Sequence, residues 1–281
     1  MTLPAGASDV RRVGGGDINE AYRVVLADGR EAFVKTRADA APGEYAAEAA
    51  GLGWLAEPGA LRTPQVLEVD ERYLALEWIP SGAGGGASAA GARALGRGLA
   101  LTHRAGAPCF GVAGGPGATA RFGSLRLSNE PAEDWPGFYA ERRLLPLARS
   151  AHERGALAAS GVAAVEGVCE RLHELAGPSE APARLHGDLW SGNVMADRQG
   201  RPWLIDPSAY GGHREIDLAM LVLFGSPPQA LFDAYEEVAP LADGWRERVE
   251  LYQLLPLLVH AVLFGDSYAG AAERAARRYA R

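Results

Sequence analysis

The clearest structural signal in the chain is residues 186–193, which read His186-Gly187-Asp188-Leu189-Trp190-Ser191-Gly192-Asn193. Eighteen residues after Asp188 comes Asp206, which ends an apolar run and is followed by Pro207. Phosphoryl transfer needs a carboxylate that orients the attacking hydroxyl and accepts its proton. It also needs oxygen ligands that hold Mg²⁺ on the nucleotide phosphates. The H-x-D-x-x-x-x-N spacing therefore predicts Asp188 as the base and Asn193 as a metal ligand, with Asp206 as the second ligand.

Each of these two stretches also has a simpler explanation. A turn-forming asparagine would account for the first, and an unrelated Asp-Pro turn would account for the second. The two occur together, however, joined by one predicted hairpin with strands at 193–196 and 202–205 around a turn at 197–200, which favours phosphoryl transfer. Ser191 lacks the G-x-S-x-G frame of a hydrolase nucleophile, and no H-E-x-x-H pair indicates a catalytic zinc.

Upstream of this hairpin, the first 80 residues are predicted to be rich in β-structure. Strands at 22–27 and 31–35 flank Asp28-Gly29, a dipeptide typical of a tight type I′ turn. Apolar residues at helical spacing predict a helix at 44–57, which Pro58-Gly59 ends. Two further strands are predicted at 66–69 and 73–79.

Helical patterns dominate after a Gly/Ala-rich joint at 82–91. They are predicted at 92–104, 135–149, 157–176, 216–224, 229–238, 244–264 and 269–279. The order of elements predicts an α+β fold with two lobes. A small antiparallel-sheet lobe with one helix would cover residues 1–79, and a larger, mainly helical lobe would cover residues 80–281.

The small lobe contains candidate phosphate-binding residues. Gly14, Gly15, Gly16 and Asp17 precede the predicted strand at 22–27, and glycines there would let backbone N–H groups approach phosphates closely. The motif is neither G-x-x-x-x-G-K-[ST] nor G-x-G-x-x-G, so an isolated copy would more simply be a flexible turn.

Lys35 is the only lysine in the chain, beside 27 arginines. It lies in the second strand after the glycine loop, where a kinase places its phosphate-binding lysine. A solvated surface lysine is the usual alternative, but this chain uses arginine for every other basic position. Glu48, on the apolar face of the following helix, is the predicted partner of Lys35. Glu44 is the rival, although its place at the helix start is explained by the helix dipole.

The strand at 73–79 ends in residues with backbone groups that could recognise a nucleotide. Glu77, Trp78 and Ile79 would lie at the junction of the lobes, and their backbone groups could hydrogen-bond an adenine edge in an interlobe cleft. A buried core strand that ends in a turn explains the same residues almost as well.

Composition excludes several function classes. The net charge of −7 argues against binding to nucleic acid or to anionic lipid, and no run of 18 apolar residues is present. Cys109 and Cys169 form no C-x-x-C pair, and the N-terminal residues lack the order of a signal peptide. These features predict a cytoplasmic protein with neither nucleic acid nor membrane as a partner.

Several segments, taken in chain order, resemble the fructosamine kinases, also called ketosamine-3-kinases. They are GGGDIN, AFVK, LEWIP, FYAERRLLP, HGDLWSGNVM and IDPSAYGGHREIDLAM. This family is part of the aminoglycoside phosphotransferase and choline kinase-like group, which has a protein-kinase-like fold. The resemblance covers nearly the whole chain. The HGD…N and IDP residues mark the wide group, whereas Trp190 and residues 210–215 are more particular to fructosamine kinases.

The resemblance implies that ATP, with Mg²⁺, phosphorylates the 3-hydroxyl of a ketosamine, the sugar adduct left on amines by glycation. The resulting 3-phosphate is unstable and releases the amine, so the role would be deglycation of a small-molecule or protein-bound substrate. The implied roles are Asp188 as base, Asn193 and Asp206 as Mg²⁺ ligands, Lys35 with Glu48 as the phosphate-positioning pair, His186 and Asp217 as supports of the catalytic loop, and Trp190, His213 and Arg143 as substrate-binding residues.

Two other functions remain open at the level of sequence. A kinase of the same fold that acts on an aminoglycoside or an amino alcohol such as choline would have the same Mg-ATP residues. A catalytically inactive nucleotide-binding scaffold is disfavoured, because it would not need Lys35, Asp188, Asn193 and Asp206 together. The preferred ketosugar, the nature of the amine and the oligomeric state are not indicated.

Overall fold

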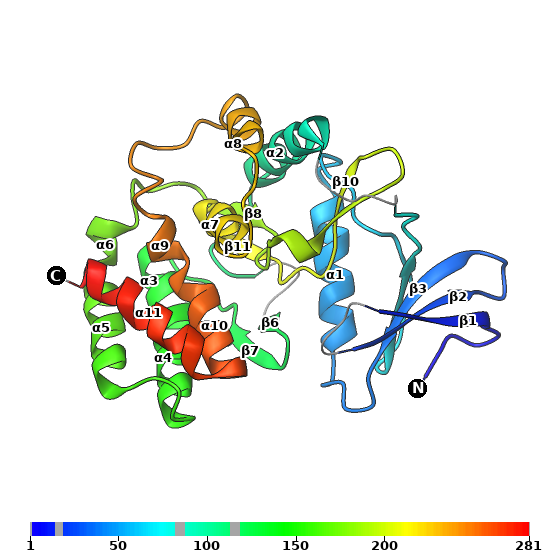
Figure 1. Ribbon diagram of the computed structural model, residues 1–281, viewed down its shortest axis with the longest axis horizontal. Coiled ribbons are helices and arrows are strands. Elements are labelled where there is room, and N and C mark those ends of the chain that lie inside the picture. The colour runs from blue at the N-terminus through cyan, green and yellow to red at the C-terminus, as the bar shows by residue number, and fades with distance from the viewer. Residues whose placement is uncertain (1, 15–18, 82–87, 113–118, 281) are drawn as a thin grey trace.

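The computed structural model describes residues 2–14, 19–81, 88–112 and 119–280. A five-stranded antiparallel sheet lies beside a larger, mainly helical part, and the helix α1 (Glu44–Ala56) stands between the two (Figure 1). The predicted fold class, an α+β chain with a small sheet lobe and a helical lobe, is confirmed. The expected helix at 44–57 agrees with α1 to within one residue.

The sheet has the spatial order β1-β2-β3-β5-β4. Its strands are β1 (Ser8–Val13), β2 (Glu20–Val25), β3 (Glu31–Thr36), β4 (Val66–Val69) and β5 (Tyr73–Glu77). Both faces of its centre are covered, because alternate residues enter different apolar clusters. Val34 and Ala75 pack on one face, whereas Leu74 and Leu76 pack against Leu52 of α1 on the other.

The strand β1 was not predicted from the sequence. Its residues are almost all exposed, so no apolar alternation marks it, and it is held by antiparallel pairing of Val13 with Ala21 of β2. The glycine-rich residues therefore connect two paired strands. Gly15, Gly16 and Asp17 lie outside the described residues, and Gly14 is described.

The turn between β2 and β3 differs from the type I′ turn that Asp28-Gly29 predicted. A type I′ turn needs a positive φ at both central residues, but of the two only Gly29 has one, at 84°. Gly29 N–H donates to the Leu26 carbonyl, and Leu26 N–H donates to the Arg30 carbonyl. The connection is thus one residue longer than predicted, with glycine at its single left-handed position.

The helical part is built from several elements of unequal length. They are α2 (Ala89–Arg104), α3 (Trp135–Tyr139), α4 (Leu145–Glu153), α5 (Ala159–Glu170), α6 (Leu172–Leu175), α7 (Glu215–Leu223), α8 (Gln229–Glu236), α9 (Val249–Tyr252), α10 (Leu254–Phe264) and α11 (Asp266–Tyr279). The predicted helix at 157–176 is divided at Arg171. Of the predicted helix at 244–264, only α9 and α10 form, because turns occupy the first residues after Gly244.

The predicted helix at 135–149 contains a π-helical segment, η1 (Ala140–Leu144), where the backbone pairing widens. Pro146 has no N–H, so the Arg142 carbonyl loses its usual partner in the next turn. The guanidinium of Arg143 donates to that carbonyl instead, at 3.0 Å.

Three short antiparallel pairs complete the part of the chain that the structure describes. They are β6 (Thr119–Phe122) with β7 (Leu125–Ser128), β8 (Ala183–Leu185) with β11 (Tyr210–Gly212), and β9 (Val194–Ala196) with β10 (Pro202–Leu204). The β9–β10 hairpin was predicted, and the other two pairs were not. Strands β8 and β11 place the residues after 185 beside those before 210.

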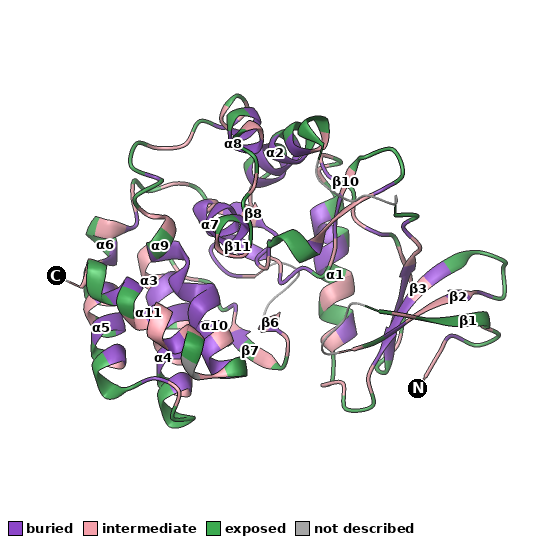
Figure 2. Cartoon of the chain, in the orientation of Figure 1, coloured by how far each residue is buried: buried purple, intermediate pink, exposed green. Residues whose placement is uncertain are grey.

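Burial is concentrated in the helical part and in the central strands of the sheet (Figure 2). The largest apolar cluster includes Phe138, Leu144, Leu185 and Leu258, so it supports the residues that precede the stretch at 186–193. None of the described helices is both long and apolar enough to cross a membrane.

Candidate active site

Asp217 of α7 fixes the backbone of the loop after β8. The Asp217 carboxylate is fully buried and accepts hydrogen bonds from the backbone N–H groups of His186 and Gly187, at 2.8 and 2.9 Å. Burial alone would raise the pKa of Asp217, but His103 and the Gly187 N–H outweigh it and hold the pKa below its usual value. The negative charge therefore persists and orients the loop. The family resemblance implied such a supporting role for Asp217.

His186 makes a second set of contacts that shape the same loop. Its Nδ1 accepts from the Asp188 N–H at 3.2 Å, so its Nε2 carries the proton that is donated to the Ile205 carbonyl at 2.9 Å. Burial lowers the pKa of His186, which keeps the ring neutral and preserves this pattern. Gly187 has a φ of 83°, and a Cβ there would lie 2.1 Å from the Ser208 carbonyl oxygen, so only glycine fits.

Asp188 lies beside Asn193, and both line the cavity described below. The Asn193 amide donates to the Asp188 carbonyl at 2.8 Å and to Oδ2 of its carboxylate at 3.2 Å. Burial and the nearby Asp206 raise the pKa of Asp188 to about 7. A carboxylate with that pKa is suited to accept a proton near neutral pH.

Asp206, just after β10, joins the two parts of the molecule through Lys35. Lys35 Nζ lies 2.9 Å from Asp206 Oδ1 and also pairs with the Glu48 carboxylate of α1. Burial alone would lower the pKa of Lys35, but Asp206 and Glu48 together raise it, so the lysine stays charged. Asp206 has a φ of 52°, a left-handed conformation that costs energy for an aspartate, and its side chain is half exposed.

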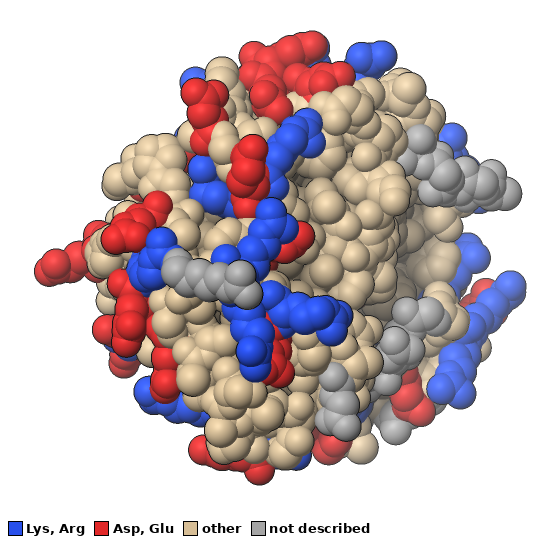
Figure 3. Space-filling model, turned by 60° about the vertical axis from the view of Figure 1, so that its left-hand side comes forward, with Lys and Arg blue, Asp and Glu red and all other residues tan. Residues whose placement is uncertain are grey.

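These side chains line one cavity of about 430 Å³ between the sheet and the helical part. Of the residues that the sequence predicted, it brings together Gly14, Lys35, Glu48, Asp188, Trp190, Asn193 and Asp206. Trp190 is 39% exposed and meets the ring of Phe224 edge to face. Acidic and basic side chains are mixed on the face shown in Figure 3, where the surface is also hollowed beside a region of uncharged residues.

Other predicted residues do not line this cavity. Glu77 accepts from the Gln65 N–H, the Trp78 ring stacks under Arg23, and Ile79 is buried. Arg143 is fully buried between the rings of Phe138 and Tyr210, where burial lowers its pKa.

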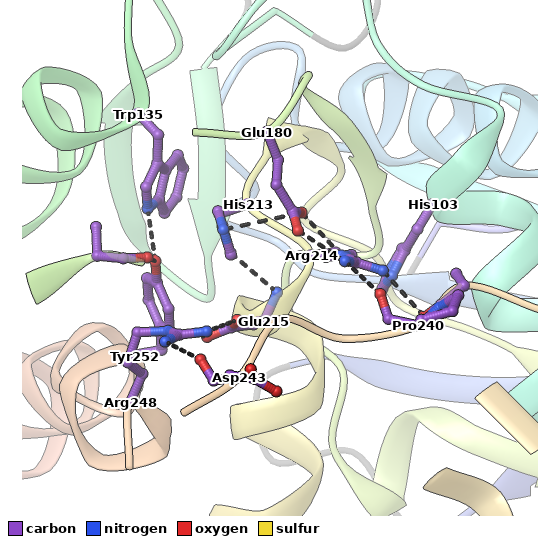
Figure 4. Close-up of polar contacts among 12 residues, drawn as sticks. His103, Trp135, Glu180, His213, Arg214, Glu215, Pro240, Asp243, Arg248 and Tyr252 are labelled. Atoms are coloured by element: carbon purple, nitrogen blue, oxygen red, sulfur yellow. Dashed lines mark hydrogen bonds and ion pairs between the residues drawn. The ribbon is translucent and has the colours of Figure 1, made fainter. Parts of the chain in front are cut away.

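His213 is also buried in the core of the helical part. Its ring stacks on that of Tyr252 and points toward Glu180, as Figure 4 shows. Burial lowers its pKa to about 4. His213 and Arg143 therefore differ from the substrate-binding positions that the sequence suggested, because tertiary packing turns both side chains inward.

The site also includes residues that sequence reasoning missed. Thr119, Ala120, Arg121 and Gly123 of the β6–β7 hairpin line the cavity. Glu44, which the sequence offered as the rival of Glu48, also lines it. The alternation of apolar and polar residues across 119–128, with Gly123-Ser124 between, is a hairpin signal that could have revealed them. The contact of His103 with Asp217, at 3.2 Å, carries no comparable sequence signal.

The family model described as fructosamine kinase matches residues 3–281. The chain belongs to the fructosamine kinase family. It is 37% identical over 264 residues to a protein from Thermus thermophilus named probable ketoamine kinase, covering 93% of this chain and 90% of that one. It is 34% identical over 268 residues to the chloroplastic protein-ribulosamine 3-kinase of Arabidopsis thaliana, covering 92% and 79%.

Solved structures agree with this membership. A protein from Thermobifida fusca, described as a fructosamine-3-kinase, superimposes with a TM-score of 0.88 at 45% identity and covers 98% of this chain and 93% of that one. A choline kinase from Streptococcus pneumoniae is only 17% identical, has a TM-score of 0.64 and covers 98% and 94%, so it shares the fold alone. As a fructosamine kinase family member, the chain is an ATP-dependent phosphotransferase.

Proposed function

We propose that this kinase transfers the γ-phosphoryl group of ATP to the 3-hydroxyl of a ketosamine. The observation that supports this most directly is one cavity that gathers Lys35 of β3, Asp188 and Asn193 of the loop at 186–193, and Asp206 after β10. The names of the relatives from Thermus thermophilus and Arabidopsis thaliana support a ketoamine or ribulosamine acceptor. The resulting 3-phosphate is unstable and would release the free amine, which completes deglycation.

In the proposed mechanism Asp188 acts on the acceptor. Its carboxylate would accept a hydrogen bond from the sugar hydroxyl and take the proton as the new bond from oxygen to phosphorus forms. The bond between that phosphorus and the β-phosphate oxygen breaks, and ADP leaves. The hydrogen bond from Asn193 fixes the Asp188 carboxylate, and Asp217 fixes the backbone beneath it.

Lys35 and Glu48 would position the nucleotide. The Lys35 ammonium is buried and held between two carboxylates, so its direction is set before ATP binds. Gly14 lines the cavity and would approach the phosphates. Trp190, with its ring partly exposed at the cavity, would face the sugar.

The donor atoms at Asn193 and Asp206 fit Mg²⁺. The Asn193 amide nitrogen is used by Asp188, which leaves the amide oxygen for a cation, and Asp206 offers a half-exposed carboxylate. No cluster of three or more His, Cys, Asp or Glu side chains suited to a metal occurs in the described ranges. Mg²⁺ usually takes several of its ligands from phosphates and water. When bound, Mg²⁺ would neutralise charge on the phosphates.

The proposal is tested by measuring ADP release with a panel of acceptors. Fructosyl-lysine and ribulosyl-lysine should support turnover that depends on Mg²⁺, with phosphate found on O3 by NMR. Choline and aminoglycosides should not. Turnover restricted to choline or an aminoglycoside would contradict the ketosamine assignment, and tight ATP binding without turnover on any acceptor would contradict catalysis itself.

A further inference from the structure

The β6–β7 hairpin forms a wall of the cavity that the proposed mechanism does not use. Ala120, Phe122 and Leu127 anchor it in the main apolar cluster of the helical part. Gly123 has a positive φ of 57°, which suits the first central residue of a two-residue turn. Because side chains alternate along a strand, Arg121 points away from the face on which Phe122 is buried, and Arg121 lines the cavity.

Arg121 is largely buried but incompletely paired. Its side chain is 12% exposed, and its Nη2 donates to the Pro42 carbonyl at 2.8 Å. Its nearest carboxylate oxygen, on Glu44, lies 4.0 Å from Nη1. That carboxylate oxygen is closer to Arg37, at 2.8 Å. The Nε of Arg121 is buried and has no hydrogen-bond partner among the residues that the structure describes.

The surroundings leave a surplus of positive charge at this wall. Arg126 stands directly opposite Arg121 across the hairpin, and no described carboxylate forms an ion pair with it. Like charges in directly opposed positions destabilise a strand pair. Burial, Arg126 and Arg37 lower the pKa of Arg121, and Glu44 opposes them only in part. A buried cation in this setting gains stability from an added anion.

We infer that Arg121 binds a carboxylate on the amine half of the substrate, which makes ketosamines of free amino acids the preferred class. This inference rests on the proposed function. Arg121 lines the same cavity as Asp188 and Trp190, which act on the acceptor in the proposed mechanism. Lys35, Asn193 and Asp206 already serve the phosphates and the metal there, so we assign the charge of Arg121 to the acceptor. The planar guanidinium matches a carboxylate through two parallel hydrogen bonds.

The chemistry of the two substrate classes makes this a selective contact. A sugar adduct on the α-amine of a free amino acid has a carboxylate one carbon away from the nitrogen. An adduct on a lysine side chain within a protein has no such anion. The charge at Arg121 therefore distinguishes the two classes.

The test compares the fructose adducts of glycine and glycinamide, which have nearly the same size and differ in charge. The parental enzyme should show a kcat/KM about tenfold or more higher for the glycine adduct, since a hydrogen bond to a charged group is worth on the order of 1.5–3 kcal/mol. In Arg121→Gln this preference should disappear, with KM for ATP and KM for the glycinamide adduct within about twofold of the parental values. Arg121→Lys should keep part of the preference for the glycine adduct.

Arg126→Gln is the matched control, because it removes the same charge from the same hairpin outside the cavity. It should keep most of the parental preference. Equal turnover of the two adducts by the parental enzyme would overturn the inference without any variant. If Arg121→Gln lost kcat/KM equally on both adducts and had a raised KM for ATP, Arg121 would act on the phosphates. That result would also overturn the inference. Failure of the parental enzyme on both adducts and on fructosyl-lysine would instead refute the proposed function itself.

Discussion

At the scale of single residues, Lys35 shows how composition and structure agree. The chain has one lysine and 27 arginines, and that lysine is buried between Glu48 and Asp206 at the cavity. A compact ammonium fits between two carboxylates from different segments. A guanidinium is planar and larger, so it would displace one carboxylate or move its own donors away from the phosphates.

Lys35→Arg should therefore behave as a severe active-site variant although the charge is kept. We expect kcat/KM for ATP to fall by about 100-fold or more, because a displacement of about 1 Å has that effect on positioned groups. Steady-state kinetics with varied ATP measure it. Arg97→Lys, at an exposed ion pair with Glu237, is the control and should have parental kinetics. Parental kinetics in Lys35→Arg itself would remove Lys35 from the phosphate site.

Asp188→Asn tests the proposed base. The amide keeps the size of the side chain but cannot take a proton, so kcat should fall by about 10²–10⁴-fold while the Kd for ATP changes little. Turnover and ATP binding are measured separately, the latter by calorimetry. A kcat within about tenfold of the parental value would show that another group accepts the proton.

At the scale of elements, the sequence predicted those that have either an apolar pattern or a motif. The β9–β10 hairpin is found within one residue of its predicted strands, because Trp203 and Leu204 are buried and a turn separates the strands. The edge strand β1 has exposed side chains, and β8 and β11 have three residues each, too short for a period to be detected. Pairing of such strands depends on backbone groups that the sequence pattern does not reveal.

The residues of the candidate site likewise fall into those that the sequence predicted and those that it did not. Asp188, Asn193 and Asp206 belong to one local motif, and Lys35 with Glu48 follows from the buried helix face, so these were predictable. Arg121 reaches the cavity through the packing of a hairpin far away in sequence. The inward orientation of Arg143 and His213 depends on stacking with residues such as Tyr210 and Tyr252, which local sequence does not encode.

The β9–β10 turn depends on Asp197, which gives a prediction with a defined pH dependence. Its carboxylate accepts from Trp203 Nε1, Arg201 Nε and the N–H groups of Gln199 and Arg201. Burial would raise the pKa of Asp197, but these four donors outweigh it and hold the pKa far below the usual value. The ionised form therefore stabilises the folded state above the pKa of an unfolded aspartate, about 3.9, and this contribution is lost as the pH falls toward the folded value.

Asp197→Asn should accordingly lower the Tm at pH 7. The difference from the parental protein should shrink as the pH is reduced below about 4. Differential scanning calorimetry across that range measures both effects. Glu153→Gln, at an exposed glutamate, should leave the Tm unchanged at every pH. A Tm difference for Asp197→Asn that does not depend on pH would mean that the ionised carboxylate contributes nothing specific.

At the scale of the whole molecule, the sheet and the helical part meet at several polar contacts besides the cavity. Arg184 Nη1 lies 2.7 Å from the Glu57 carboxylate just after α1, and the Leu204 N–H donates to the Arg62 carbonyl at 2.8 Å. The ion pair of Lys35 with Asp206 joins the two parts at the cavity itself. We propose residues 1–79 and 80–281 as the two lobes, so that the active site is assembled from both.

A site assembled from two lobes predicts that Mg-ATP stabilises the whole chain and that Asp206 is needed for the metal-dependent part. A ligand at about 100 times its Kd stabilises the folded state by about 2.7 kcal/mol, which for a chain of this length raises the Tm by several degrees. Removal of Mg²⁺ with EDTA should cancel most of that rise.

Asp206→Asn is the informative variant, because asparagine also tolerates the left-handed backbone at this position and only the charge is removed. In Asp206→Asn, ATP should raise the Tm only slightly, and by the same amount with and without Mg²⁺. In Glu153→Gln, the rise in Tm with Mg-ATP should equal that of the parental protein. A full Mg²⁺-dependent rise in Asp206→Asn would exclude Asp206 as a metal ligand and would restrict its role to the ion pair with Lys35.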